Sequence, residues 1–426
     1  MNQQDNVTPL DAAKAKRGRP SLPKKMPTVA FPADLAVNYK KGKYESTLEN
    51  VVQALRCHDV TGVQLAYDRF FAEEGVFING NWTPLSDNLI TEMRLRLAGL
   101  DFDKVSKENA RDAMFYVCEN SAFDSAQRWL MAQEWDGKPR IEKFFSRCFR
   151  CEGDEDYIAA VSRYTWTALA GRIMEPGIKA DMVPLIHGVQ GARKSTGVRL
   201  ISPFAESYAS FNLNDKDDVL ARKMRGCIVG ELEELRGLHG RDAESTKAFF
   251  SSPHDEWVPK FKEFKVRSPR RVVFIGTTNN PQILNDSTGN RRYLPMTCGP
   301  VDCEAIEKNR SQLWAEALHT FKENGIMWQQ AEELARKVHD NFRVIDPWED
   351  VLENYLELDN DHANPLDFVT VEALFSRLGM DMGRVGNSQH NRLHAIMTRF
   401  GYEKSRPRVN GRKERGYALR KGDNPL

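Results

Sequence analysis

The most constraining feature of this 426-residue sequence is a glycine-containing loop between a short apolar run and a helix-forming segment. The apolar run covers residues 182–186 (MVPLI). A strand, a glycine-rich loop and Lys-Ser/Thr at a helix start place backbone N–H groups around phosphates. The pattern predicts a P-loop that binds ATP, with Lys194 on the phosphates and the Ser195 hydroxyl on Mg²⁺. The residues expected to line the nucleotide are Gly188, Val189, Gln190, Gly191, Ala192, Arg193, Lys194, Ser195 and Thr196.

One position departs from the G-x-x-x-x-G-K-[ST] pattern. Arg193 occupies the place of the second glycine, and Gly191 supplies a flexible point two residues earlier. The arginine either adds positive charge beside the phosphates or points away from them, and the sequence leaves both options open. The structural alternative to a P-loop is an ordinary glycine-containing turn before a helix.

Two more apolar runs end in polar clusters. Residues 227–229 (CIV) precede Gly230-Glu231-Leu232-Glu233-Glu234, and residues 271–275 (RVVFI) precede Gly276-Thr277-Thr278-Asn279. Short apolar runs separated by helical stretches predict βα units and a parallel sheet, so the clusters should meet at one carboxyl edge. A carboxylate there can hold Mg²⁺ and polarise water, and an amide can orient water against the γ-phosphate.

Paired arginines follow the amide cluster within residues 289–295 (GNRRYLP). Arg291 and Arg292 are either a solvated patch or include an arginine finger, which stabilises the transferring phosphate. A finger supplied by a neighbouring subunit would imply a ring of identical chains.

Charge is distributed unevenly along a chain whose formal net charge is only +1. Residues 1–43 carry nine Lys/Arg against three Asp, and residues 402–423 carry eight against three acids. Two basic ends suggest a polyanionic partner. The segment Arg17-Gly18-Arg19-Pro20 resembles an AT-hook, in which Arg17 and Arg19 would enter the minor groove of A·T tracts. The alternative is a generic solvated basic arm.

A second candidate DNA contact lies in residues 257–265 (WVPKFKEFK), where lysine and phenylalanine alternate. As a strand, the segment would place Lys260, Lys262 and Lys265 on one face for phosphates, with Phe261 or Phe264 available for stacking. A half-buried amphipathic strand with a solvated lysine face is an equally good interpretation.

The C-terminal segment predicts a third DNA contact. Thr370 can cap one helix and Ser388 another, and Asn410-Gly411 then predicts a hairpin. Two helices followed by a basic hairpin have the order of a winged helix-turn-helix. Its phosphate contacts would come from six basic residues: Lys404, Arg406, Arg408, Arg412, Lys413 and Arg415.

The predicted organisation has four parts. Residues 1–43 form a disordered basic arm, 44–150 a mostly helical domain, 151–345 the α/β P-loop domain and 346–426 the winged-helix-like domain. Within the second part, Ser46 is expected to cap a helix and Asn79-Gly80 to turn a hairpin. The sequence has no long apolar run and no secretory signal, and its scattered cysteines suit a reducing cytosol. Cys148 and Cys151 form a lone CxxC pair, so no metal beyond Mg²⁺ is expected.

Taken together, these residues resemble the virulence-associated E family of P-loop ATPases from phages and mobile elements, which is similar to superfamily 3 replicative helicases. The resemblance covers roughly residues 110–300. It rests on six stretches in order: 135–140 (WDGKPR), 176–179 (PGIK), 188–196, 230–232 (GEL), 276–279 (GTTN) and 288–292 (TGNRR).

The resemblance implies an AAA+-like core that forms hexameric rings on DNA in the cytoplasm of a bacterial host. It assigns Glu231 as the Walker B acid beside Mg²⁺, with Glu233 and Glu234 as alternatives. Asn279 becomes sensor 1, and Arg291 or Arg292 the finger. A hairpin near residues 257–265 would project into the ring channel. No catalytic acid cluster precedes the ATPase region, so a separate primase is a candidate partner.

Two functions follow as hypotheses. The first is an ATP-dependent DNA helicase or DNA-stimulated ATPase that acts in replication on single-stranded or forked DNA. The second is an ATP-binding DNA regulator or interference factor that does not unwind DNA, which the arginine at position 193 favours. A small-molecule P-loop kinase would leave both basic ends unexplained.

Overall fold

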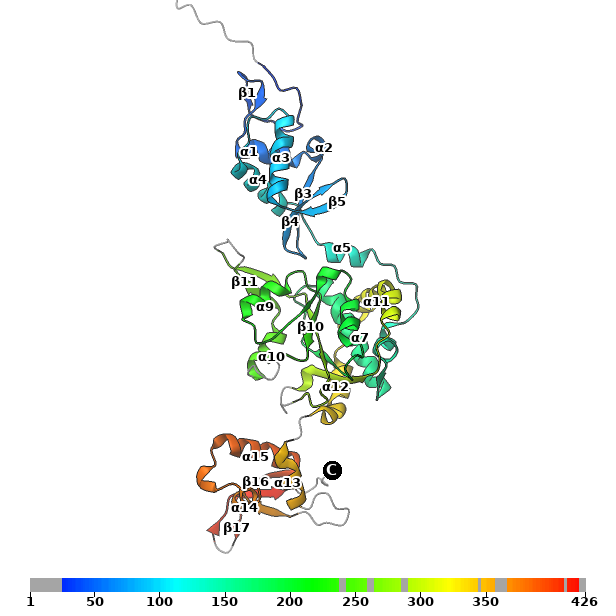
Figure 1. Ribbon diagram of the computed structural model, residues 1–426, viewed down its shortest axis with the longest axis vertical. Helices are drawn as coiled ribbons and strands as arrows, with labels where there is room; N and C mark the ends of the chain where they lie inside the picture. Colours follow the sequence, from blue (N-terminus) through cyan, green and yellow to red (C-terminus); the bar gives the residue numbers. More distant parts are fainter. Residues whose placement is uncertain are drawn as a thin grey trace, which may run out of the picture.

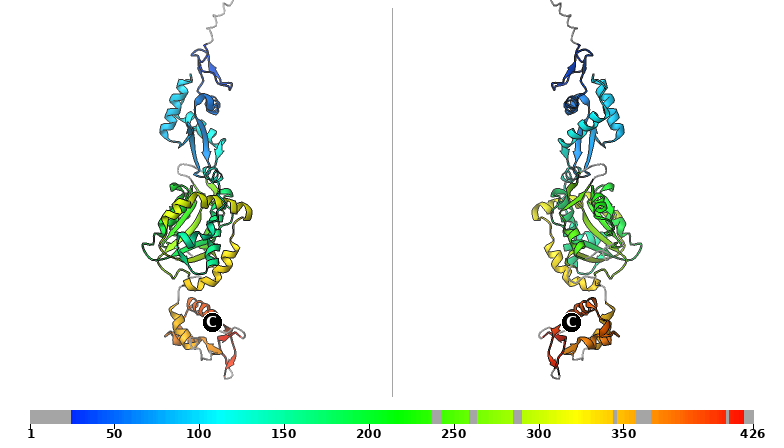
Figure 2. Two further views of the ribbon diagram at one scale, coloured as in Figure 1. Left: turned by 90° about the vertical axis from the view of Figure 1, so that its right-hand side faces the viewer. Right: turned by 90° about the vertical axis from the view of Figure 1, so that its left-hand side faces the viewer.

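The computed structural model describes residues 25–236, 243–258, 264–284, 290–343, 346–356, 366–409 and 412–420. These residues form three units arranged along one long axis (Figures 1 and 2). Arg17, Arg19, Lys260, Phe261 and Lys262 lie outside the described residues. None of the helices that the structure describes is both long enough and apolar enough to cross a membrane.

The N-terminal unit packs helices against one face of a small sheet. The sheet order is β5-β4-β3-β6, and β1 and β2 form a separate two-stranded sheet. Capping by Thr47 begins the first helix, because its hydroxyl accepts from the Asn50 N–H at 3.3 Å; the expected cap, Ser46, is one residue too early. The bounds are β1 Val37–Asn38, β2 Lys43–Tyr44, α1 Leu48–Arg56, α2 His58–Thr61, β3 Gln64–Asp68, β4 Glu73–Ile78, β5 Asn81–Pro84, α3 Asp87–Gly99, α4 Lys107–Glu119 and β6 Ala122–Phe123.

The predicted hairpin at Asn79-Gly80 is confirmed. Ile78 pairs with Asn81, and both turn residues have positive φ, 51° at Asn79 and 80° at Gly80. This is the geometry that a two-residue hairpin turn requires. The structure therefore adds a four-stranded sheet to the helices expected between residues 44 and 150.

The central unit is built on a six-stranded sheet with the order β7-β14-β8-β13-β10-β9. All neighbouring strands are parallel except the edge pair β14 and β7. The strands are β7 Cys151–Glu152, β8 Val183–His187, β9 Tyr208–Ser210, β10 Val229–Glu233, β13 Val273–Thr278 and β14 Tyr293–Cys298. The three strands expected from apolar runs are present, because parallel strands buried on both faces must be apolar throughout.

Helices cover both faces of this sheet. They are α5 Ser125–Met131, α6 Phe144–Cys148, α7 Glu155–Met174, α8 Lys194–Ile201, α9 Asp217–Met224, α10 Ala243–Ser251, α11 Cys303–Asn324 and α12 Gln329–Val338. Short 3-10 turns are η1 Ile141–Lys143, η2 Ala205–Ser207, η3 Asn290–Arg292 and η4 His339–Phe342, and β11 His254–Trp257 pairs with β12 Val266–Pro269.

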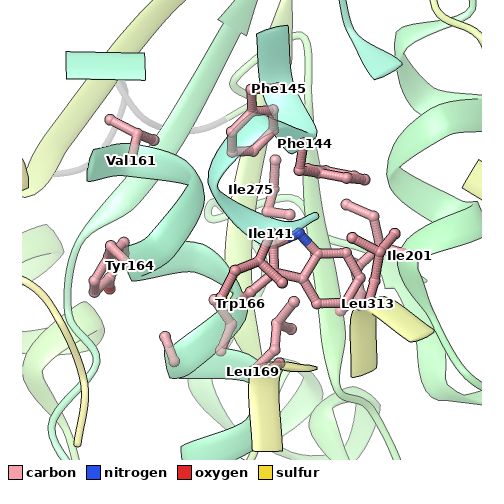
Figure 3. Packing of buried hydrophobic residues seen from close by; sticks show 14 of the residues in the cluster. Ile141, Phe144, Phe145, Val161, Tyr164, Trp166, Leu169, Ile201, Ile275 and Leu313 are labelled. Atoms are coloured by element: carbon pink, nitrogen blue, oxygen red, sulfur yellow. The ribbon is translucent and has the colours of Figure 1, made fainter. Parts of the chain in front are cut away.

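Alternate strand residues point into different clusters, so Val273 and Ile275 face α7 and α11 while Phe274 faces the opposite layer. On the α7 side, Trp166 lies fully buried beside Ile141 and Leu313 (Figure 3).

The core of the central unit begins earlier than residue 151. Ala126, Leu130 and Phe144 belong to the same buried cluster as the sheet. The packing therefore favours a boundary near residue 125 over the expected one near residue 150.

The C-terminal unit has its own buried cluster, which includes Leu352, Phe375 and Ile396. Its three-stranded sheet has the order β15-β19-β16. Thr370 caps α14 as expected, whereas α15 begins at Asn387, one residue before the expected cap Ser388. The bounds are α13 Pro347–Leu356, β15 Phe368–Thr370, α14 Val371–Arg377, η5 Met382–Arg384, α15 Asn387–Arg399, β16 Tyr402–Ser405, β17 Arg408–Val409, β18 Arg412–Lys413 and β19 Gly416–Leu419. The pairing of β17 with β18 confirms the predicted hairpin, whose tip lies outside the described residues.

Candidate functional site

The loop of residues 188–193 begins at the end of β8, where little space is left beside the Gly188 backbone. A Cβ on Gly188 would lie 2.7 Å from Cys298 Sγ and 2.8 Å from its carbonyl oxygen, so only glycine fits. The Gly188 N–H donates to the Thr278 carbonyl at 3.2 Å, which ties the loop to the neighbouring strand β13. Gly191 and Arg193 both have positive φ, 85° and 63°. Two left-handed residues give the loop its sharp curvature before α8 begins at Lys194.

The Lys194 side chain folds back over this loop. Its ammonium donates to the Gly188 carbonyl at 2.7 Å, the Val189 carbonyl at 3.1 Å and Asn279 Oδ1 at 2.7 Å. Lys194 is only 7% exposed, and a buried cation needs such partners. The loop and the end of β13 therefore meet at a single charged atom.

Asn279 extends this contact to a carboxylate. Its Nδ2 donates to Glu234 Oε1 at 2.9 Å, and its backbone N–H donates to Glu234 Oε2 at 3.3 Å. The parallel register of β10 and β13 pairs Glu233 with Thr277, so Glu234 and Asn279 both lie just past their strand ends. Lys194, Asn279 and Glu234 consequently form one hydrogen-bonded chain across three loops at the carboxyl edge of the sheet.

Glu231 is held inside the sheet. It is fully buried, Thr277 Oγ1 donates to its Oε1 at 2.6 Å, and the Tyr208 hydroxyl donates to its Oε2. Burial and the Glu231 carboxylate raise the pKa of Tyr208, which keeps this hydroxyl a donor. The third acid, Glu233, is half-buried and lies 4.0 Å from Arg236. The three acids of this cluster thus occupy three different environments.

Residues around the first turn of α8 complete the edge. Arg193 is exposed, whereas Ser195 and Thr196 are half-buried. Burial raises the pKa of the Cys303 thiol at the start of α11, and the charge of Arg193 opposes that rise. The Arg193 charge therefore acts on the α11 side of the loop.

The two candidate finger residues differ in their contacts. Arg292 lies 3.5 Å from Asp181, donates to Ser251 Oγ at 3.1 Å, and is largely buried. Arg291 is exposed. Of the two, Arg291 has the side chain that is accessible to another molecule.

The candidate DNA-binding residues are placed only in part. The expected strand over residues 257–265 falls mostly on residues outside the described part of the chain; β11 ends at Trp257 and its antiparallel partner β12 begins at Val266. Lys265 forms an ion pair with Glu256, and Phe264 is 81% exposed. Lys413 and Arg415 are exposed on the C-terminal unit, while the side chain of Arg412 lies outside the described residues.

Sequence reasoning missed Tyr208, Thr277 and Asp181. Thr277 could have been found from the sequence, because it lies in the last two residues of β13, just before the predicted site residue Asn279. Tyr208 comes from a three-residue strand without an apolar run, and Asp181 contacts Arg292 only through the tertiary fold.

A family model described as the virulence-associated protein E-like domain matches residues 130–344. The chain belongs to this family. The match of the virulence-associated protein E-like domain begins within α5 and ends after η4, so it includes all six strands of the central sheet and the loop of residues 188–193. The expected family resemblance is confirmed.

The fold likeness to solved structures covers more of this chain than the virulence-associated protein E-like domain does. The apo structure of the NrS-1 C-terminal region has a TM-score of 0.52 and 12% identity, and the match covers 87% of this chain and 99% of that chain. Its A form has a TM-score of 0.50 and 13% identity, covering 86% and 98%. These identities establish a likeness of fold only. None of the curated proteins compared with this chain matches it.

Proposed function

We propose that this chain is a P-loop ATPase that acts as a DNA helicase, or DNA-stimulated ATPase, in the replication of a phage or mobile element. The observation that carries the proposal is the hydrogen-bonded chain from Lys194 through Asn279 to Glu234. It joins a glycine-rich loop, an amide and a carboxylate at the edge where parallel α/β sheets bind ligands.

The sheet topology supports an AAA+-like core. The loop strand β8 lies next to β13, which carries the amide, and β10, which carries the acids, is one strand further along. The loop, the amide and the acids therefore follow each other along one edge, as ATP hydrolysis requires.

The residues at this edge fit ATP and Mg²⁺. Phosphate oxygens would replace the Gly188 and Val189 carbonyls as partners of the Lys194 ammonium. The Ser195 hydroxyl would hold Mg²⁺, and Glu231 would reach the ion, directly or through water, once Tyr208 gives up its hydrogen bond to the carboxylate. Mg²⁺ supplies charge neutralisation on the phosphates when bound. Glu234, accessible and fixed by Asn279, would orient the attacking water.

Oligomerisation and DNA binding complete the proposal. The accessible Arg291 serves as the finger toward the nucleotide of a neighbouring subunit in a homo-oligomeric, hexameric ring. Lys265, which lies just before β12, would contact DNA in the ring channel together with Lys260 and Lys262 of the same sequence stretch. The basic arm with Arg17 and Arg19 would add a minor-groove contact. The order α13, β15, α14, α15, β16, β19 supports a winged-helix unit.

A hydrolysis assay tests the proposal. Phosphate release by the wild type, with and without single-stranded DNA, is compared with Lys194→Ala and with Lys322→Ala, an exposed lysine on α11. We expect Lys194→Ala to lower the rate by on the order of 100-fold, since it removes a preorganised cation, and Lys322→Ala to leave it unchanged. Wild-type activity no higher than that of Lys194→Ala would reject the ATPase.

A second candidate is an ATP-binding DNA regulator that does not unwind DNA. It is favoured by Arg193 in place of glycine and by a Lys194 ammonium already bonded to its own loop. Strand displacement on a forked duplex separates the candidates. A helicase releases the displaced strand only with hydrolysable nucleotide, whereas the regulator binds ATP and the fork and releases nothing.

A further inference from the structure

A cavity of about 850 Å³ opens on the C-terminal unit, between the N-terminal half of α15 and the strands below it. Figure 1 places α15 along one side of this unit, across β16. Asn387, His390 and Asn391 line the cavity from the helix. Their spacing puts them on one helical face, because residues three and four apart are neighbours.

The opposite side of α15 is held against α13. Arg392 donates to both oxygens of Asp346 at 2.6 Å and stacks over the Trp348 ring at 4.0 Å. Arg399 forms an ion pair with Glu349. These contacts neutralise two arginines of α15 and fix its rotation, so Asn387 and Asn391 remain exposed toward the cavity.

Three cations stand on the other rim. Lys404, Arg406 and Arg415 line the cavity and are exposed. Within the part of the C-terminal unit that the structure describes, the ion pairs use Arg343, Arg392 and Arg399 and none of these three. Their charges are therefore available to a polyanion.

The cavity lining also contains carboxylates, which are unfavourable in a site that binds only phosphate. Glu372 and Glu414 face the same cavity. Carboxylates repel phosphates, but they accept hydrogen bonds from the cytosine amino group, and asparagine pairs with adenine N6 and N7 in the major groove. A mixture of amide, imidazole and carboxylate groups matches base edges, while the rim cations match the backbone on either side.

We infer that this surface reads the sequence of duplex DNA, with the N-terminal half of α15 in the major groove. Asn387, His390 and Asn391 contact base edges, and Lys404, Arg406 and Arg415 contact flanking phosphates. The major groove, about 12 Å wide, admits one α-helix. The inference rests on the proposed function only in taking DNA as the partner. It adds a sequence-specific duplex site to a chain whose proposed helicase activity would act on single strands or forks.

The test uses the full-length Lys194→Ala variant without nucleotide, so that no step depends on hydrolysis. A pool of random duplexes is selected for binding, and the enriched duplex, a scrambled duplex and a single strand are compared by fluorescence anisotropy at several salt concentrations. We expect the enriched duplex to bind at least about tenfold tighter than the other two. An unenriched pool, or a single strand bound as tightly as the duplex, overturns the inference.

Three further variants locate the preference on this surface. Asn391→Ala should lose discrimination at one base pair by about 5- to 150-fold without altering the salt dependence. Arg415→Ala should weaken binding to every duplex alike and reduce the salt slope by about 0.9. Arg377→Ala, an exposed arginine of the same unit that does not line the cavity, should change neither quantity.

Circular dichroism and thermal melting show whether each variant is folded. A preference that survives both Asn391→Ala and Asn387→Ala would place sequence reading elsewhere, for instance at Arg17 and Arg19, and would reject the assignment. A loss of affinity for all sequences in Asn391→Ala would reduce the surface to a phosphate contact. Failure of wild-type hydrolysis would reject the proposed ATPase but leave this selection unaffected.

Discussion

At the scale of single residues, the backbone conformation of Arg193 shows why the general pattern has a glycine at this position. Arg193 has a φ of 63°, a left-handed conformation that costs a non-glycine residue roughly 1–2 kcal/mol. The loop keeps the curvature that glycine normally supplies and places an exposed side chain on the α11 side. The departure from the pattern therefore changes charge more than shape.

Substitution of Arg193 can separate strain from charge. Arg193→Gly relieves the left-handed strain but adds unfolded-chain entropy of about 0.5–1 kcal/mol, so the free energy of unfolding should change by less than about 1 kcal/mol. Arg193→Val places a β-branched side chain in the same conformation and should be clearly less stable than Arg193→Gly. Urea denaturation measures both, and equal stability of the two variants would contradict the observed backbone. Hydrolysis by Arg193→Gly then reports the combined effect of removing the charge and relieving the strain.

Asn279 carries the hydrogen-bonded chain between Lys194 and Glu234. Asn279→Ala removes both side-chain links, so kcat for ATP hydrolysis should fall by roughly 100- to 1000-fold, as for loss of one preorganised donor. Asn280→Ala is the control. Asn280 is the next residue along the chain, and in the described structure its side chain accepts a hydrogen bond only from the Gln282 N–H. A similar loss in both variants would point to damage of the loop rather than to loss of the amide.

At the scale of elements, the sequence predicts the strands of the site better than the side chains that they present. The runs before Gly188, Gly230 and Gly276 stand out because strands buried on both faces must be apolar. Edge strands such as β7 and β9 are too short to be recognised, and β3 in the N-terminal unit (QLAYD) has neither an apolar run nor a regular alternation of buried and exposed residues. Their positions follow from tertiary packing.

The choice among the three acids also lies beyond sequence reasoning. Strand alternation puts Glu231 and Glu233 on the same face, so only the partners Tyr208 and Thr277 distinguish them. Glu234 reaches Asn279 because its own φ of 51° turns the chain after β10. Neither a tertiary hydroxyl nor a left-handed residue has a signal in this part of the sequence.

The junction of β8 with the loop depends on the absence of a side chain at Gly188. Gly188→Ala would press a Cβ against the Cys298 carbonyl, which cannot move away without disturbing β14, and should cost about 1–3 kcal/mol of stability and weaken nucleotide binding. Gly191→Ala meets no atom within 4 Å and should cost only the left-handed strain, about 1–2 kcal/mol. Isothermal titration with a nucleotide distinguishes them: we expect a marked loss of affinity only for Gly188→Ala.

The contact of η4 with β14 should make stability depend on pH. His339 Nε2 lies 2.8 Å from the Tyr293 carbonyl, and burial lowers the pKa of His339. Because the folded state disfavours the charged imidazole, stability is full above the unfolded pKa of about 6.5 and falls as the pH drops through that value toward the folded pKa. The difference in unfolding free energy between wild type and His339→Gln, measured from pH 8 to pH 5, should shrink on acidification; a constant difference would exclude His339 as a cause.

At the scale of the whole molecule, charged side chains join the three units that Figure 2 shows in a row. Asp124 caps α5 and also accepts from Arg271 at 2.5 Å, and Arg271 stacks near Phe70 of the N-terminal unit. Glu73 pairs with Arg225 at 2.6 Å. The N-terminal unit is thus attached to the central sheet close to the hairpin strand β12, whose last residue, Pro269, lies two residues before Arg271.

A single carboxylate joins the central and C-terminal units. Glu349 is 2% exposed and forms ion pairs with Arg343, which follows the central unit, and with Arg399 of α15. Breaking a fully buried pair typically costs about 3–5 kcal/mol. Neutralising Glu349 should cost less than this, because Arg343 and Arg399 are partly exposed to solvent. Through this residue, the position of α15, for which we propose a role in reading DNA, is coupled to that of the central sheet.

Glu349→Gln should therefore loosen the C-terminal unit without altering the ATPase edge. We expect a wider distribution of molecular dimensions in small-angle X-ray scattering and an earlier unfolding transition for the C-terminal unit. Asp350→Asn, an exposed acid on the same helix, is the matched control and should behave like the wild type. Since the hydrogen bonds and ion pairs of Glu349 in the described residues involve neither Lys194 nor Asn279, hydrolysis without DNA should be unchanged. Stimulation of hydrolysis by duplex DNA should fall, because DNA bound at α15 would no longer restrain the central unit. Unaltered scattering in Glu349→Gln would show that the two units are held together by other contacts.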